Sequence, residues 1–494
     1  MQQIRTAYLA GGANGHGEAA AGDHLQTGYR LWLVGDQLEH GRAPWRDPYS
    51  FQPEAPKQWN VAGWPFGLPY WPLVALFGPV LAWNLFTLLV YGAAGALTFL
   101  WLRALELSRG AALVGGLAFA LAPYRVEQSV GHLLGPISIL LPLTLWSIET
   151  RRFWFATLAL ASIPLSGQVH LALGAIPLAA AYALVRRRDR RTLVGAAVMV
   201  AAAVAAGLLV QHAVIAGSIE AGGRSLAEVT RYSAHWSDFV ERHDRDGPER
   251  FVFLGWLTPL VALAGVASLA VSRRAALAVL LALAAVVPML LALGTTLPLY
   301  STLWRHVEPF RFPRVPERLM PIACLALAAL VAFALDRVRA PALIAIAVVA
   351  IALDLDVNAY GRSAADPHNR AYAALRAAPP GRLLELPVFT PDLHYGSVYM
   401  AYDMQVRRER PGGYSTLARK VADVAARELK PLSCGEDPKN DALDRLGVRY
   451  VAVHRGLYRA ARLDPACEAA ATRKLRRLGF RTLATDGPVG VYAR

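Results

Sequence analysis

The 494-residue sequence lacks the common signatures of soluble enzymes. It has no P-loop, no dinucleotide-binding fingerprint between a strand and a helix, no paired CxxC motif and no nucleophile elbow. It has 51 basic and 36 acidic residues, a net charge of +15. No run of Lys and Arg interleaved with aromatic residues points to a nucleic-acid partner. The basic charge therefore needs another explanation.

The sequence contains ten apolar stretches, most of which approach the roughly 20 residues that a membrane-spanning helix needs. Many of the basic residues lie in the short loops between these stretches, which accounts for much of the positive charge. The stretches are 79–102, 110–124, 133–149, 154–165, 168–185, 193–215, 252–271, 275–294, 318–335 and 341–356. Every second connection carries arginines: Arg103 and Arg109; Arg151 and Arg152; Arg186, Arg187, Arg188, Arg190 and Arg191; Arg273 and Arg274; Arg337 and Arg339. By the positive-inside rule these loops are cytoplasmic, and the other loops and both long ends face the periplasm or the exterior.

The pattern predicts a mainly α fold, a polytopic transmembrane helical bundle with a small C-terminal extracytoplasmic α/β domain. Residues 1–78 form an outer loop, 79–356 the ten-span domain and 357–494 the extracytoplasmic domain. Export of residues 1–78 requires a hydrophobic element ahead of them, and residues 1–25 contain no apolar run of sufficient length. We therefore expect that a first transmembrane helix is missing from this sequence.

The outer loop has two segments with the composition of the membrane interface. Leu25 to Leu38 places apolar residues at helical spacing, with Asp36 and Gln37 on the other side. Residues 63–72 are rich in Trp, Tyr and Pro, and predict a second interfacial or re-entrant helix. The aromatic rings, Trp64 among them, either anchor the chain in the membrane or contact a ligand.

The C-terminal region changes composition at about residue 357, where charged residues and prolines return. Residues 382–388 and 448–454 are typical of short buried strands, and 416–430, 437–446 and 466–478 of helices. A hairpin is predicted at 481–493 around Asp486-Gly487-Pro488. Cys434 and Cys467 both fall in this exported region, whereas Cys324 lies in a span, so the pair is predicted to form a disulfide. The alternative is two unpaired thiols, because two cysteines alone fix no geometry.

Candidate site residues lie in the outer segments. Asp23, where the amphipathic helix begins, is placed to act as a general base for a hydroxyl acceptor, or alternatively as the cap of that helix. Arg311, Arg314 and Arg318 break the inside-positive pattern, so they either bind a lipid phosphate or anchor the chain to headgroups. His24, His132 and Trp64 are further candidates for lining the site.

The order of these features resembles the GT-C superfamily of membrane glycosyltransferases, in particular a broad bacterial group of multi-spanning proteins. The stretches that carry the resemblance are Gly22-Asp23, Ala122-Pro123-Tyr124-Arg125 with Gly131-His132, Arg314-Val315-Pro316-Glu317-Arg318, Leu384-Glu385-Leu386-Pro387, Gly412-Gly413-Tyr414-Ser415 and Leu446-Gly447-Val448-Arg449-Tyr450.

The resemblance implies an inverting sugar transferase that uses a polyprenyl-phosphate-linked donor at the outer face of the inner membrane. The acceptor would be a cell-envelope glycan or lipid. Asp23 would be the catalytic base, and Arg314, Arg318 and Arg125 would bind the donor phosphate. No second acid is adjacent to Asp23, so the sequence gives no support for a divalent metal.

Two other functions fit the same pattern. A transporter or flippase of lipid-linked saccharides would have polar residues deep in its spans or broken helices in two corresponding halves. Apart from Gln168, His170, Gln211 and His212 the spans are apolar, which favours chemistry at the interface. A scaffold that binds a glycan without turnover is the second alternative.

Overall fold

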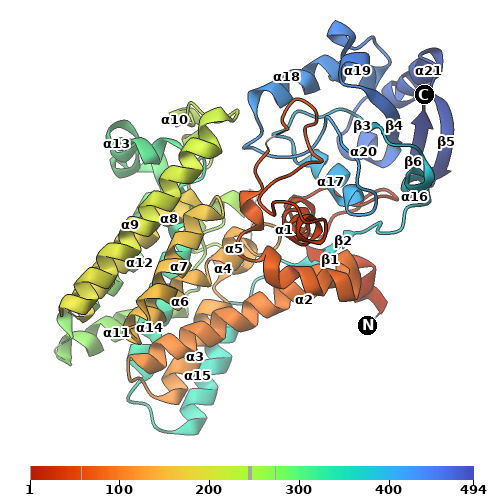
Figure 1. Ribbon diagram of the computed structural model, residues 1–494. Helices are drawn as coiled ribbons and strands as arrows, with labels where there is room; N and C mark the ends of the chain where they lie inside the picture. The colour runs from red at the N-terminus through yellow and green to blue at the C-terminus, as the bar shows by residue number, and fades with distance from the viewer. Residues whose placement is uncertain (1, 57, 188, 243–247, 273) are drawn as a thin grey trace. The chain divides into compact units, whose positions relative to one another are not determined.

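A computed structural model describes residues 2–56, 58–187, 189–242, 248–272 and 274–494 (Figure 1). Arg188 and Arg273 of the predicted cytoplasmic loops lie outside these ranges. The chain forms two compact units. The first consists of residues 1–86, 213–221 and 360–494, and the second of residues 87–212 and 222–359.

The second unit is helical. Its elements are α3 (Arg109–Ala120), α4 (Pro123–Glu127), α5 (Leu134–Ile137), α6 (Leu140–Glu149), α7 (Phe153–Leu165), α8 (Val169–Arg186), α9 (Arg190–Ala213), α10 (Leu226–Arg231), α11 (Leu257–Val271), α12 (Ala275–Ala292), α13 (Pro298–His306), α14 (Met320–Leu335) and α15 (Pro341–Asp354). Each predicted apolar stretch overlaps an apolar helix of the structure. Among the residues that the structure describes, five helical segments are long and apolar enough to cross a membrane: Gly67–Ala104, Val169–Arg186, Arg190–Gly217, Ala275–Ala292 and Pro316–Leu335. The chain is a multi-pass membrane protein of mainly α structure.

Helix α14 forms the core of the second unit. It packs against α3, α11 and α12, and its residues from Met320 to Phe333 are buried. Small residues permit this close packing. At Gly265 of α11, the first carbon of any side chain would lie 1.9 Å from the Leu330 carbonyl oxygen, so only glycine fits there. Large apolar side chains such as Leu208, Leu260 and Ile346 are instead exposed, as expected of a surface that faces lipid.

Helix α2 (Gly67–Ala104) is interrupted at Gly78, whose φ of 73° lies in the left-handed region that favours glycine. The predicted span 79–102 is the part after this interruption. The part before it, from Gly67, is the second helix that the aromatic segment predicts. Both predicted helices are therefore present, and they meet at Gly78.

The first unit combines the two ends of the chain. Its N-terminal elements are β1 (Ala7–Ala10) and α1 (Asp23–Glu39), and β1 pairs antiparallel with β2 (Gly361–Ala364). The C-terminal helices are α16 (Arg370–Ala377), α17 (Ser397–Asp403), α18 (Lys420–Leu429), α19 (Ala442–Arg445), α20 (Arg455–Ala460) and α21 (Pro465–Arg477). The strands β3 (Arg382–Leu386), β4 (Val448–His454), β5 (Arg481–Asp486) and β6 (Val489–Ala493) form a sheet in the order β3-β4-β6-β5, with β3 and β4 parallel.

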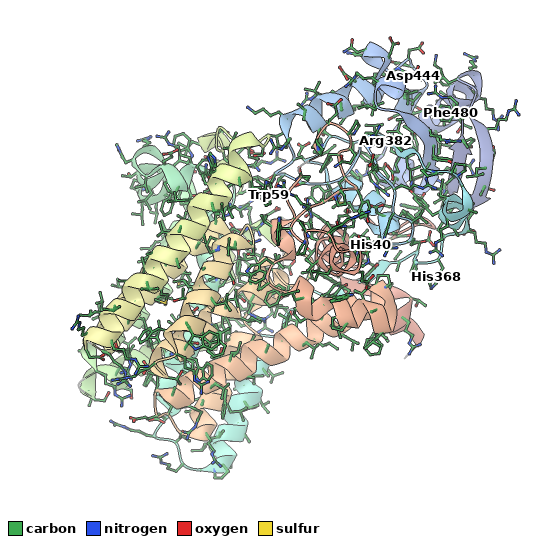
Figure 2. All side chains as sticks on the ribbon, in the orientation of Figure 1. His40, Trp59, His368, Arg382, Asp444 and Phe480 are labelled. Carbon is green, nitrogen blue, oxygen red and sulfur yellow. A yellow bond between two sulfur atoms is a disulfide. The ribbon has the colours of Figure 1, made fainter. Side chains whose placement is uncertain are left out.

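The predicted strands and hairpin of the C-terminal region match β3, β4, β5 and β6. The predicted helices correspond to α18, α19 and α21 within a few residues. Apolar residues of the sheet and of these helices, such as Leu386, Val451 and Leu475, share one core. Phe480, labelled in Figure 2, belongs to the same core and is 1% exposed. Short apolar runs were therefore a sufficient signal for β3 and β4, and the Asp486-Gly487-Pro488 turn for the hairpin of β5 and β6.

Helix α1 differs from the prediction of a surface helix, because almost all of its residues from His24 to Gln37 are buried within the first unit. The polar residues Asp36 and Gln37 are buried with them. The hydroxyl of Tyr49 donates to Asp36 Oδ2 at 2.8 Å, and Arg407 forms an ion pair with the same carboxylate. These partners, distant in sequence, make it possible to bury a charge that the sequence pattern would leave exposed.

A second buried network also holds α1 in place. Arg410 is fully buried and is paired with Glu385 of β3 and with Asp403 of α17, the latter at 2.6 Å. The hydroxyl of Tyr29 on α1 lies 3.4 Å from Asp403 Oδ2 and 2.9 Å from Asp47 Oδ1. Burial raises the pKa of Asp403 to about 7, although the charge of Arg410 opposes the shift.

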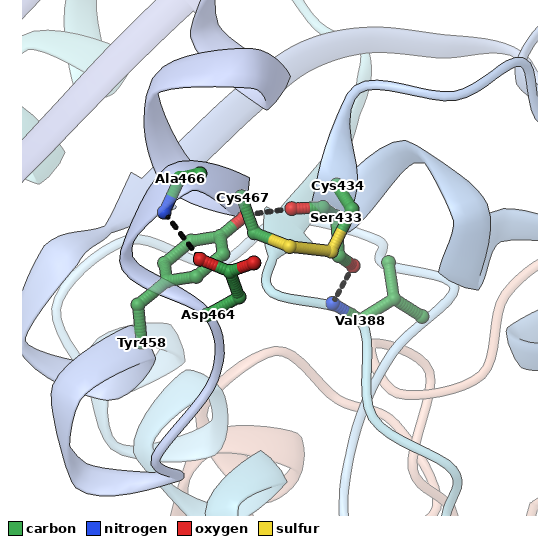
Figure 3. Close-up of a disulfide and its surroundings, with 7 residues drawn as sticks. All are labelled: Val388, Ser433, Cys434, Tyr458, Asp464, Ala466 and Cys467. Carbon is green, nitrogen blue, oxygen red and sulfur yellow. Dashed lines mark hydrogen bonds between the residues drawn. A yellow bond between two sulfur atoms is a disulfide. The ribbon is translucent and has the colours of Figure 1, made fainter.

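The disulfide joins Cys434 to Cys467, the pair that the sequence predicts (Figure 3). Cys434 ends the short helix Lys430–Cys434, and Cys467 lies in the first turn of α21. Beside it, the Tyr458 hydroxyl donates to the Ser433 carbonyl at 2.8 Å, and Ser433 Oγ accepts from the Val388 amide at 2.8 Å. The crosslink therefore ties α21 to the segment that covers the end of β3.

Loss of the disulfide should destabilise the first unit. The two cysteines are 33 residues apart, and a crosslink that closes a loop of this length contributes roughly 2–4 kcal/mol. Unfolding of the purified protein should occur at a lower temperature in reductant or in the Cys434→Ser variant. Cys324→Ala, which removes the buried thiol of α14, should keep the response to reductant. Equal stability with and without reductant would contradict the prediction.

The stability of the first unit should depend on pH through Asp403. An Asp ionises near pH 4 in an unfolded chain, whereas the pKa of buried Asp403 is about 7. Between these values the folded state binds a proton that the unfolded state has lost, so stability falls as the pH rises from about 4 to about 7.

Asp403→Asn cannot ionise and should remove this part of the slope, which melting temperatures measured from pH 4 to pH 8 would show. Asp423→Asn is the control, because its partner Arg427 is solvent-exposed. A slope that is the same in Asp403→Asn and in the unmodified protein would exclude Asp403 as its source.

Candidate functional site

Asp23 is the first residue of α1. Gly22 occupies the cap position and provides no side-chain hydrogen bond, so the interpretation of Asp23 as the cap is wrong. The Asp23 side chain is partly exposed. A carboxylate in the first turn of a helix is stabilised by the helix dipole, which favours the ionised form that a base requires.

The C-terminal segments of the first unit fix the position of Asp23. The Gly22 amide donates to Ser397 Oγ at 3.2 Å, and Gln26 Nε2 donates to the Tyr414 carbonyl at 2.7 Å. Ser397 begins α17, which packs along α1. Tyr414 belongs to the stretch Gly412-Gly413-Tyr414-Ser415 that carries the family resemblance. Two segments nearly 400 residues apart in sequence therefore meet at the start of α1.

His24 points into the core of the first unit and is 3% exposed. Its ring lies 5.2 Å from the ring of Tyr8 and 6.4 Å from that of Trp83. Burial lowers the pKa of His24 to about 4, and the neighbouring Asp23 opposes this shift. The imidazole is therefore neutral near pH 7. Trp64, the other candidate in this unit, is 37% exposed.

In the second unit, the structure brings together two of the predicted residues, Arg318 and His132. Arg318 Nη1 lies 3.2 Å from His132 Nδ1 and donates to Gln128 Oε1 at 3.2 Å. His132 Nδ1 lies 2.8 Å from the same Gln128 oxygen. Arg318 and His132 are both partly exposed. The group therefore presents a guanidinium and an imidazole that are linked through one amide.

Arg314 is paired with a carboxylate and packed on an aromatic ring. Its Nη2 donates to Glu249 Oε1 at 3.1 Å, and its guanidinium carbon lies 4.8 Å from the centre of the Tyr232 ring. Arg311 instead closes the end of α13, where it donates to the carbonyls of Trp304 and Arg305. Arg314 therefore has a fixed orientation, and Arg311 has a local structural role.

The structure adds Arg224 and His170, which the sequence did not single out as phosphate-binding candidates. The charges of Arg224, Arg314 and Arg318, named here the arginine cluster, all act on the partly exposed imidazole of His170. The Arg224 amide donates to the Arg311 carbonyl at 2.7 Å, which joins its loop to the 311–318 segment. Arg224 lies in the long loop after α9, where nothing local distinguishes it from other loop arginines.

Glu317, between the two arginines in sequence, is fully buried. Within the described ranges, neither of its carboxylate oxygens has a hydrogen-bond partner. Arg318, Arg314 and Glu249 are among the charged groups that act on it. The carboxylate of Glu249, which pairs with Arg314, thus offsets part of the positive charge of the arginine cluster.

Arg125 has a different environment from the one that the resemblance implies. It is fully buried, and it donates to Ser138 Oγ at 3.0 Å and to the carbonyls of Ala120 and Val90 at 3.0 and 3.2 Å. These partners tie the end of α3 to α2 and to the segment after α5. Arg125 is therefore left out of the phosphate site proposed below.

Within the part of the chain that the structure describes, no group of three or more His, Cys, Asp or Glu side chains is arranged to hold a metal ion.

Comparison with known proteins relates the chain to solved membrane transferases. No protein-family model matches it, and neither does any curated protein sequence. The cryo-EM structure of the arabinofuranosyltransferase AftD from Mycobacteria aligns with 99% of this chain at 18% identity and a TM-score of 0.57. The chain spans 40% of the length of that protein.

Two further structures align at lower scores. The oligosaccharyltransferase AglB from Archaeoglobus fulgidus gives a TM-score of 0.46 at 12% identity, over 97% of this chain and 70% of that one. ArnT from Cupriavidus metallidurans gives 0.40 at 13% identity, over 100% and 95%. The likeness to AftD extends over both units, and it shows that this chain has the fold of GT-C membrane glycosyltransferases.

Proposed function

We propose that the protein transfers a sugar from a polyprenyl-phosphate-linked donor to a glycan or lipid acceptor of the cell envelope. The observation that carries this proposal is the arginine cluster, in a chain that has the GT-C fold. Three guanidinium groups whose charges all act on one imidazole suit a phosphate better than they suit an apolar lipid tail.

In the proposed reaction Asp23 is the general base. The acceptor hydroxyl attacks the anomeric carbon of the donor sugar, and the bond from that carbon to the phosphate oxygen breaks. Asp23 takes the hydroxyl proton, and the polyprenyl phosphate leaves with the bonding electrons. Attack from the side opposite the leaving group inverts the anomeric configuration. The partial exposure of Asp23 and its place at a helix N-terminus support this role.

The arginine cluster would hold the donor phosphate and stabilise the charge that grows on it as the sugar departs. Arg318 is linked to His132 through Gln128, and Arg314 is fixed by Glu249 and Tyr232. Guanidinium groups held in this way need little rearrangement when the phosphate arrives.

We place this site at the outer face of the inner membrane. The arginine-bearing loops alternate along the chain as the positive-inside rule requires, which puts Asp23, the arginine cluster and residues 357–494 on the outer side. The disulfide between Cys434 and Cys467 supports this orientation, because such bonds persist in oxidising compartments.

Asp23→Asn should abolish transfer, because the amide keeps the size of the side chain but has no basic oxygen. The purified protein in lipid nanodiscs would be given farnesyl-phosphate-linked arabinofuranose or mannose, with an alkyl glycoside as acceptor. Product would be measured by mass spectrometry. Asp464→Asn, at the cap of α21, is the matched control and should keep activity. Full activity of Asp23→Asn with either donor would overturn the proposed role.

Arg314→Ala and Arg318→Ala should weaken binding of undecaprenyl phosphate, used as a probe. Removal of one partner of a desolvated charge pair costs roughly 2–5 kcal/mol, which is a loss of at least about 30-fold in affinity. The dissociation constant can be measured by native mass spectrometry. Arg427→Ala, an exposed arginine of α18, should bind as the unmodified protein does. Equal affinity in all four proteins would rule out the arginine cluster as the phosphate site.

A further inference from the structure

We infer that Glu18 and His454 are positioning residues for Asp23. A buried contact between them fixes the short segment that leads into α1, and with it the carboxylate of Asp23. The inference rests on the proposed role of Asp23, but the contact and its effect on the segment can be tested without any sugar donor.

Glu18 is 2% exposed and His454, the last residue of β4, is 0% exposed. Glu18 Oε2 lies 2.6 Å from His454 Nδ1, and Glu18 Oε1 accepts from the Gly456 amide at 2.6 Å. The carboxylate thus uses both of its oxygens on the turn that follows β4. A carboxylate is the side chain that accepts two such bonds, because an amide of the same size has one acceptor oxygen and one donor nitrogen.

The contact continues to a third residue. His454 Nε2 lies 2.9 Å from the hydroxyl of Tyr372 on α16, whose ring stacks on Tyr402 at 4.3 Å. With Glu18 ionised, Nδ1 carries the proton, and in the neutral ring Nε2 accepts from the Tyr372 hydroxyl. The orientation of His454 is therefore fixed from both sides.

The segment from Glu18 to Asp23 is held by this contact, by the burial of Ala19 and Ala20 and by hydrogen bonds of its backbone. Residues 19–22 are Ala-Ala-Ala-Gly, so Glu18 supplies the long side chain nearest to Asp23 on this side. Beyond it, the Ala20 amide donates to the Ala364 carbonyl at 2.9 Å and the Gly22 amide to Ser397 Oγ at 3.2 Å. Alanine and glycine provide few packing contacts, and glycine has high conformational freedom when it is released.

The position of Glu18 relative to Asp23 excludes Glu18 as the base itself. It lies five residues before Asp23 and is buried, so it is not itself placed to receive a proton from an acceptor. A displacement of the reacting group by about 1 Å is enough to slow an enzymatic reaction about 100-fold. Fixing the approach to α1 is therefore a function in its own right, distinct from stabilising the sheet.

The test compares Glu18→Gln with Tyr458→Phe in the full-length protein. Glu18→Gln keeps the size of the side chain but leaves the His454 or the Gly456 donor without its acceptor. Tyr458→Phe removes a buried hydrogen bond to the Ser433 carbonyl in the same domain, beside the disulfide and away from the N-terminal segment. Tyr372→Phe is a milder variant that loosens His454 while keeping Glu18 paired, and it should give the same changes in smaller size.

Two measurements report on the segment directly. Hydrogen exchange of the peptide that contains residues 15–25 should be at least tenfold faster in Glu18→Gln than in the unmodified protein. Carbodiimide labelling of Asp23, followed by mass spectrometry, should also become faster. Both should be unchanged in Tyr458→Phe, even if its melting temperature falls. Unchanged exchange and labelling in Glu18→Gln would overturn the inference.

Turnover of the farnesyl-phosphate-linked donor separates positioning from other roles. Glu18→Gln should lower kcat at least tenfold while KM for the donor changes less than threefold, and the midpoint of the pH profile of kcat should stay in place. Loss of activity with a shifted midpoint, or faster labelling with full turnover, would refute positioning. Failure of the proposed function appears differently, as full activity in Asp23→Asn with the exchange results unaffected.

Discussion

The first unit depends on the burial of one guanidinium group, that of Arg410, between two carboxylates. An arginine without exposure must be paired, and Glu385 and Asp403 provide the pairing from a strand and from a helix. The backbone of the same residue also bonds on both sides to the loop after α1, through Tyr49 and Gln52. Arg410 therefore joins the sheet, α17 and the loop after α1, and α1 packs against α17.

This arrangement explains why a helix with the composition of a membrane surface element is found inside the protein. Asp36 and Tyr29 would be costly to bury alone, and each has its partner in a segment that folds against α1. Two of the stretches that carry the family resemblance take part in these contacts: Glu385 pairs with Arg410, and the carbonyl of Tyr414 accepts from Gln26 of α1. Their shared environment gives them a structural role around the residue proposed as the base.

The second unit differs from the first in that large apolar side chains lie on its surface as well as in its core. Small residues let α11 and α3 approach α14, and large ones such as Leu260 and Ile346 are left outside. Hydropathy and the alternation of arginines were therefore enough to find its helices. Arg314 pairs with Glu249, and the charge of Arg224 acts on the same imidazole as those of Arg314 and Arg318. Both results depend on the folding of loops that are far apart in the sequence. Composition contains no such information.

The sequence by itself determined the apolar helices, the strands β3 to β6, the cysteine pair and the residue types of the candidate site. These follow from periodicity, hydropathy and compartment, which are properties of short windows of sequence. Only the tertiary structure decided that β1 pairs with β2, that α1 is buried, that Arg125 is used internally and that Glu18 meets His454. Each of these results from a partner far along the chain. The free energy of burying a polar group is set by that partner, and no local pattern identifies it.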